Sequence, residues 1–230
     1  MAFAYWLSFM PEEWEIAALE LHALAGVPLQ ALSKPRPIVV HELACDISPA
    51  AYTRLCIELL AQAPSLPALQ AEVQALGLHA PGFRVDVHRV PPRPRLDTLA
   101  AAAALGQYIG GRPNLSKPSV RFVCLAQAGC FLFGRQLSRA RRDWHDAGQR
   151  PVNFSNALPP RLARVLVNLV ARPGDRLLDP CCGVGTVLIE AHRLGIWAEG
   201  YDISAPNVAN ARRNLQAFGV SAPVAVGDAR

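Results

Sequence analysis

The chain has 230 residues, 51% of them hydrophobic and 18% charged, and this composition excludes a mostly disordered protein. Six Cys are too few for a disulfide scaffold, no Cys or His spacing fits a zinc site, and the formal net charge is +5. Because we find neither a secretory signal nor the roughly 18-residue apolar run of a membrane span, we expect a cytoplasmic protein with reduced thiols, no metal and no membrane contact.

The first part of the chain, residues 1–138, predicts an α+β unit. Apolar and polar residues alternate strictly over 83–90, which is typical of a half-buried strand. Further strands are expected at 3–9 and 37–43, with a hairpin over 119–134. Helices are expected at 11–25, 49–63 and 96–108, and Pro64 and Pro67 are expected to break the second of these.

Positive charge is concentrated between residues 135 and 164. This window holds seven Arg but only two acidic residues, Asp143 and Asp146. We interpret residues 139–158 as a basic linker between two domains. Such a block is typical of a surface that binds a polyanion, but from charge alone a solvated linker with unpaired arginines explains it equally well.

The pattern changes after residue 159 to alternating helices and short strands. Helices are expected at 161–171, 186–194 and 204–218, and strands at 176–179, 197–202 and 224–226. The order β-α-β-α-β predicts that residues 159–230 form the first half of a Rossmann-like, doubly wound α/β domain.

The segment from Asp179 to Thr186, Asp-Pro-Cys-Cys-Gly-Val-Gly-Thr, joins a predicted strand to a predicted helix. Its two glycines let the backbone approach a ligand, and Asp202 and Asp228 follow the next two strands at the same sheet edge. A dinucleotide is disfavoured, because a carboxylate about 4 Å from a phosphate costs several kcal/mol. The pattern favours S-adenosylmethionine, with its ribose on Asp202 and its adenine amino group on Asp228. The alternative is a structural turn whose aspartates only cap helices.

These residues resemble a known family. Residues 179–191 are similar to the signature D-P-F-C-G-S/T-G-G/T-x-L-I-E-A of THUMP-associated RNA methyltransferases, and most similar to the enzymes that methylate N2 of guanosine 10 in tRNA. Further similar segments are 141–144, 150–151, 158–169, 210–215 and 226–229. The resemblance implies a ferredoxin-like part plus a THUMP RNA-binding domain over 1–138, and S-adenosylmethionine-dependent N2-methylation of a guanosine in tRNA.

The resemblance also implies site residues. The cofactor-binding residues would be Asp179, Pro180, Gly183, Gly185, Thr186, Asp202, Ile203, Asp228 and Ala229. Asp179 and the glycines would hold the methionine end, Asp202 the ribose, and the last residues the adenine. The arginines expected to contact tRNA are Arg135, Arg139, Arg141, Arg142 and Arg150.

The sequence departs from the family pattern in several places. Cys181, Val184 and Ala157 replace an aromatic residue, a Ser/Thr and a hydroxyl residue. The catalytic tetrad, Asp/Asn-Pro-Pro-aromatic, does not occur, so the catalytic residues are unknown in this chain. We expect a truncated product or one half of a split enzyme, with a second polypeptide completing the sheet. The alternatives are a non-catalytic RNA-binding module and a ribosomal RNA methyltransferase.

Overall fold

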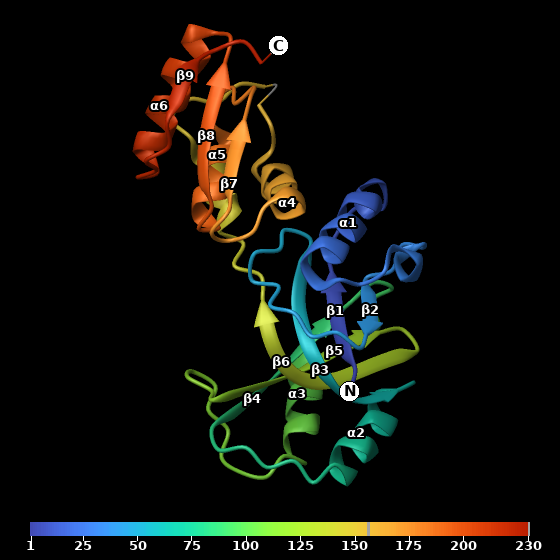
Figure 1. Ribbon diagram of the computed structural model, residues 1–230. Coiled ribbons are helices and arrows are strands. Elements are labelled where there is room, and N and C mark those ends of the chain that lie inside the picture. The colour runs from blue at the N-terminus through green and yellow to red at the C-terminus, as the bar shows by residue number, and fades with distance from the viewer. Residues whose placement is uncertain (156, 230) are drawn as a thin grey trace. The chain divides into compact units, whose positions relative to one another are not determined.

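The computed structural model describes residues 1–155 and 157–229, except the side chains of residues 145, 147 and 148. Contacts divide the chain into two compact units (Figure 1). Unit 1 comprises residues 1–48 and 52–139, and unit 2 comprises residues 49–51 and 140–230. No helix in the described part of the chain is both long and apolar enough to cross a membrane. The chain contains helices and strands in both units, and each unit has its own sheet.

Unit 1 is built on a six-stranded sheet with the order β2-β1-β3-β6-β5-β4. Strands β4 and β5 run parallel, and the other four pairings are antiparallel. The strands are β1 (Phe3–Leu7), β2 (Ile38–His41), β3 (Thr53–Ala63), β4 (Phe83–Arg89), β5 (Val120–Gln127) and β6 (Cys130–Arg139). The helices are α1 (Trp14–Ala25), α2 (Leu66–Ala75) and α3 (Thr98–Gly106), with short 3-10 turns η1 (Pro11–Glu13) and η2 (Leu29–Leu32).

The core of unit 1 has two layers, because β5 is buried on both faces. Phe122 and Cys124 pack in one hydrophobic cluster together with residues of α2 and α3. Val123 and Leu125, which point the opposite way along the same strand, pack in a second cluster with residues of β1, β3 and β6. The sheet therefore separates a helix-covered layer from a second apolar layer.

The predicted helix over 49–63 is wrong, because residues 53–63 form the strand β3. This strand lies between β1 and β6 and is largely buried. A strand covered on both faces has a nearly continuous apolar sequence, which periodicity cannot distinguish from a buried helix. Gly134 of β6 shows how closely the strands approach, since a Cβ there would lie 2.0 Å from the carbonyl oxygen of Glu58.

Two element boundaries in unit 1 also differ from expectation. Pro67 does not break a helix but lies in the first turn of α2, where a proline is tolerated. The hydroxyl of Ser65 caps this helix by accepting a hydrogen bond from the Ala68 amide at 3.3 Å. Strand β6 continues to Arg139, beyond the expected end of the hairpin at residue 134, so Arg135 lies in this strand.

Unit 2 contains a three-stranded parallel sheet with the order β7-β8-β9. Its elements are η3 (Asp143–Gln149), α4 (Pro160–Val170), β7 (Arg176–Asp179), α5 (Thr186–Arg193), β8 (Trp197–Asp202), α6 (Ala205–Ala217) and β9 (Val224–Val226). The predicted β-α-β-α-β order is confirmed. The core lies between the sheet and the helices, with Leu177, Leu188, Ala198, Val208 and Leu215 among its buried residues.

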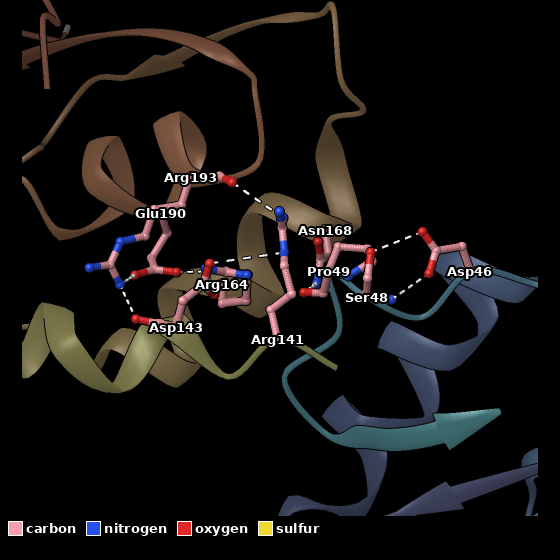
Figure 2. A network of polar contacts seen from close by, with 9 residues as sticks. All are labelled: Asp46, Ser48, Pro49, Arg141, Asp143, Arg164, Asn168, Glu190 and Arg193. Carbon is pink, nitrogen blue, oxygen red and sulfur yellow. Dashed lines mark hydrogen bonds and ion pairs between the residues drawn. The ribbon is translucent and has the colours of Figure 1, made fainter. Parts of the chain in front are cut away.

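The stretch expected as a basic linker packs within unit 2 from residue 140 on, where it is fastened by a buried ion-pair network (Figure 2). Arg164 of α4 is fully buried, and its Nε lies 2.6 Å from Oε2 of Glu190 in α5. Its Nη2 lies 2.8 Å from Oδ1 of Asp143 in η3. Arg193 approaches Glu190 at 3.4 Å and donates to the Asp143 carbonyl. The network therefore joins η3 to both α4 and α5.

We expect Glu190→Gln to lower the free energy of unfolding of unit 2 by about 3 kcal/mol, because it leaves the buried Arg164 guanidinium with only the partly exposed Asp143 as a counter-charge. Amide hydrogen exchange in α5 under increasing urea measures this loss. The control is Arg141→Gln, since the half-exposed Arg141 lies 3.9 Å from Asp143 and its loss should cost less than about 1 kcal/mol. Equal effects of the two substitutions would contradict a stabilising role for the buried pair of Arg164 and Glu190.

Candidate cofactor-binding site

The glycine loop between β7 and α5 has a backbone that other residues adopt poorly. Gly183 and Gly185 have φ angles of +53° and +83°, in the left-handed region that favours glycine. A Cβ on Gly185 would touch Ala211 of α6 at 3.5 Å, whereas the space beside Gly183 is open. The loop is thus packed against α6 at one glycine and leaves its backbone accessible at the other.

Asp202, the last residue of β8, holds this loop. Its Oδ2 accepts a hydrogen bond from the Gly183 amide at 2.9 Å. Its Oδ1 accepts from the Ser204 amide at 2.9 Å and from Nδ2 of Asn207 at 3.1 Å. Burial by itself raises the pKa of Asp202, but these three hydrogen bonds outweigh it and hold the pKa below its ordinary value. The carboxylate is therefore ionised and fixed, and Oδ2 keeps a lone pair for a further donor.

Asp179, the last residue of β7, has the opposite electrostatic character. Burial raises the pKa of its carboxyl group, and the negative charge of Asp202 raises it further. The hydrogen bond that Oδ1 accepts from the Cys181 amide at 3.2 Å only partly compensates. Two neighbouring strands thus end in carboxylates that repel one another, and a cation between them would relieve the repulsion.

A cavity of about 400 Å³ opens beside the loop, with Asp179, Gly183 and Asn207 in its lining. Phe154, Ala157 and Leu158 supply an apolar wall. Among the described residues that line the cavity, Asp179 is the only charged one. The cavity therefore combines apolar walls with a single negative charge, which suits a cationic organic molecule better than a phosphate.

The apolar wall is fastened to the loop by a side chain that sequence reasoning did not single out. Asn214 of α6 is fully buried; its Oδ1 accepts from the Val152 amide at 2.9 Å. Its Nδ2 donates to the carbonyls of Val152 and Val184, at 2.9 and 3.0 Å. One amide thus ties the segment before the wall to the glycine loop. A buried Asn on the inner face of an amphipathic helix was the available signal.

Arg150 takes a different place from the one expected. It is only 7% exposed, and its guanidinium donates to the hydroxyl of Thr186 and, at 2.8 Å, to Oδ1 of Asn153. It is thus directed into unit 2 and braces the first residue of α5, and RNA cannot reach its charge in this conformation. Thr186 is buried as well, so its hydroxyl serves this brace.

The remaining expected cofactor residues lie at the carboxyl edge of the sheet. Ile203 is 69% exposed and directly follows β8, and Asp228 and Ala229 are exposed beyond β9. Val226, at the end of β9, is a further exposed apolar side chain there that the sequence reasoning missed. Pro180 is exposed at the start of the glycine loop.

The remaining arginines expected to contact RNA do not form one set. Arg135 of β6 is paired with Glu58, with Nη2 and Oε2 2.6 Å apart. Arg139 is exposed at the end of β6 in unit 1. Arg141 donates to the Arg193 carbonyl at 3.3 Å in unit 2, and Arg142 lies 5.8 Å from the ring centre of Trp144. RNA contact by these four residues stays a prediction.

We expect Asn214→Ala to loosen the cavity wall, because it removes three hydrogen bonds and leaves the Val152 amide without its acceptor. The free energy of unfolding of unit 2 should fall by about 1–3 kcal/mol. Exchange of the Val152 amide should accelerate more than that of core amides in β8. The matched control is Asn210→Ala on the same helix, where no such bridge exists among the described residues. Unchanged exchange at Val152 in Asn214→Ala would refute this role.

The second half of the chain is similar in sequence to known methyltransferases. Residues 147–230 match the family model described as RMKL-like, methyltransferase domain (UPF0020). Over 123 residues, the chain is 39% identical to the tRNA (guanine(10)-N2)-dimethyltransferase of Pyrococcus abyssi and 43% identical to that of Methanothermobacter thermautotrophicus. Each match covers 52% of this chain and 37% of the relative. The matched segment therefore spans little more than a third of the length of these curated relatives.

Solved structures show the same fold over nearly the whole chain. TrmN from Thermus thermophilus has a TM-score of 0.53 and 21% identity, covering 99% of this chain and 74% of that one. SMU.472, solved in complex with SAH, has a TM-score of 0.51 and 12% identity, covering 98% and 75%. By sequence, the similarity to the RMKL-like methyltransferase domain family covers residues 147–230.

Proposed function

We propose that the protein is an S-adenosylmethionine-dependent methyltransferase that modifies N2 of a guanosine in tRNA. The observation that carries the proposal is the cavity beside the glycine loop, whose only charged lining residue among those described is Asp179. S-adenosylmethionine carries a sulfonium and an ammonium group, and the negative charge of Asp179 would favour both. The proposed substrate rests on the relatives named as tRNA (guanine(10)-N2)-dimethyltransferases.

The residues present fit the cofactor. Asp179 and the open side of Gly183 would hold the methionine end, and the remaining lone pair of Asp202 Oδ2 would accept a ribose hydroxyl. Ile203 and Val226 offer apolar surface to an adenine ring, with Asp228 and Ala229 at its edge. When bound, S-adenosylmethionine supplies a methyl group on a positively charged sulfur. That SMU.472 was solved with SAH supports the assignment.

The chain's own residues would act on the reaction by positioning and electrostatics. Asp179 would place negative charge in the cavity lining, Asp202 would add a second negative charge at the Gly183 amide, and Phe154 and Leu158 would form an apolar wall. The target amine belongs to a base, so tRNA would have to present that nucleotide unstacked. Unit 1 would serve as the RNA-binding region, in the ferredoxin-like and THUMP arrangement that the resemblance implies.

We expect Asp179→Asn to weaken S-adenosylmethionine binding about tenfold, which corresponds to about 1.4 kcal/mol. The substitution removes the negative charge but keeps the oxygen that accepts from the Cys181 amide. Asp175→Asn, one residue before β7 begins and outside the cavity lining, is the matched control and should leave the affinity unchanged. Isothermal titration calorimetry measures both. Equal affinities of the wild-type chain and Asp179→Asn would remove the electrostatic basis of the proposal.

Cofactor binding by the wild-type chain should depend on pH through Asp179. Because the pKa of Asp179 is raised, its charge, and with it the affinity, should be lost as the pH falls toward its folded pKa, above the ordinary value of about 3.9. This protonation does not destabilise unit 2, since the folded state takes up that proton more readily than the unfolded chain. The stability from Asp202, whose pKa is lowered, is lost only at lower pH. Asp179→Asn should lack the pH-dependent step, and its persistence would contradict the assignment.

Methyl transfer to tRNA transcripts tests the proposed activity. We expect the whole protein to which this sequence belongs to form N2-methylguanosine, identified by mass spectrometry of nucleosides and mapped by sequence position. A methyl group on another base, on ribosomal RNA or on DNA would overturn the proposed substrate. Tight tRNA binding without cofactor binding would favour a non-catalytic RNA-binding module instead.

A further inference from the structure

Unit 1 contains a cavity of about 500 Å³ that is far richer in positive charge than the cofactor cavity. Three arginines line it, Arg54 from β3, Arg89 from β4 and Arg93 from the following loop, together with Trp6 from β1. Most of the other lining residues are apolar, namely Leu7, Phe9, Pro11, Pro35, Pro37, Pro91 and Pro92. The described lining residues include no Asp or Glu. The cavity therefore offers apolar walls to an anionic ligand.

Two walls of this cavity are formed by prolines, one by Pro35 and Pro37 and the other by Pro91 and Pro92, and backbone hydrogen bonds fix both. The Leu7 amide of β1 donates to the Pro37 carbonyl at 2.8 Å. On the other side, the Val90 amide donates to the Ala126 carbonyl at 2.8 Å, and the Ala128 amide donates to the Pro92 carbonyl at 3.0 Å. Both walls are thus joined to strands of the sheet, so the cavity is formed before any ligand arrives.

An aromatic ring and a guanidinium group lie together in the cavity. The Arg54 guanidinium carbon lies 5.2 Å from the ring centre of Trp6. The Trp6 ring is also supported by His88 of β4, with ring centres 5.0 Å apart and planes inclined by 32°. An aromatic surface beside a cation is the combination that binds an unstacked base and its phosphate.

Asp86, on the same strand as Arg89, does not neutralise the charge of Arg89 or Arg93. Asp86 of β4 already pairs with Arg84 at 2.6 Å and with Arg121 at 3.2 Å. Arg89 and Arg93 are exposed, and within the described part of the chain neither belongs to an ion pair. The pKa of His88 is lowered, first by burial and then by Arg139 and Arg54, although Asp86 raises it. The cavity thus lies in a positive field.

We propose that this cavity binds one nucleotide of single-stranded RNA, with its phosphate between Arg89 and Arg93 and its base against Trp6 and the proline walls. The inference rests on the proposed function insofar as RNA is the substrate, but the site lies in unit 1 and takes no part in cofactor binding. A volume of about 500 Å³ is in the range of small-molecule sites. Duplex RNA is disfavoured, because its bases are stacked and paired.

The test is fluorescence anisotropy of fluorescein-labelled hexauridylate titrated with the chain at several salt concentrations. Arg89→Gln combined with Arg93→Gln should weaken binding about tenfold and reduce the slope of log affinity against log salt by about 0.7, as expected for one lost phosphate contact on a single strand. The matched control combines Arg112→Gln with Lys117→Gln, which removes the same charge from exposed residues of unit 1 outside the cavity lining. It should change the affinity by less than about twofold.

Ultraviolet crosslinking of the probe to the wild-type chain gives a second readout. We expect the crosslinked peptides to contain Trp6 or residues 90–95. Equal losses in the two double variants, crosslinks confined to other segments, or no binding of hexauridylate by the wild-type chain would each overturn the inference. Calorimetry with S-adenosylmethionine on the wild-type chain tests the cofactor site separately, so failure of either proposal is recognisable by itself.

Discussion

The hydrogen bond between the Gly183 amide and the Asp202 carboxylate is the contact on which the candidate cofactor site depends. It joins the glycine loop after β7 to the end of β8, and the other oxygen of Asp202 caps the start of α6 through Ser204. One ionised side chain thus connects the glycine loop, the end of the neighbouring strand and the start of the next helix. Without this contact, the open backbone at Gly183 would have no defined position relative to Asp179.

Asn214 extends the same arrangement to the opposite wall. By bonding both Val152 and Val184, it connects the segment before α4 to the loop that Asp202 holds. The ion-pair network of Arg164 then fastens the preceding turn η3 to α4 and α5. The cavity lining is therefore assembled from segments distant in sequence that buried polar groups hold in place. Both polar atoms of the Asn214 amide have partners, and a fully bonded buried group favours one arrangement over its alternatives.

The α/β part of the fold was predictable because its signals are local. Strand β7 ends at the glycine loop and β8 at the helix cap Ser204, and the helices that follow bury apolar side chains. Strand β3 was not predictable, because its two neighbours β1 and β6 are contributed by distant parts of the chain. Its apolar run became a strand only through that pairing, which no local pattern reveals.

The arginines show why charge density in a sequence window does not locate a binding surface. Arg135 meets Glu58 from a strand 77 residues away, and Arg150 and Arg164 are buried in unit 2. By contrast, Arg89 and Arg93 lie in a region whose nearby acid, Asp86, is already paired with Arg84 and Arg121. The location of a binding surface depends on which cations the fold leaves without a counter-charge.

Two RNA-binding sites on one chain would reinforce each other. Binding at the first site raises the effective concentration of RNA at the second, into the millimolar range where the connection is short and flexible. Under the proposed function, a single-nucleotide site of modest affinity in unit 1 would therefore help to retain an RNA whose target base binds to unit 2.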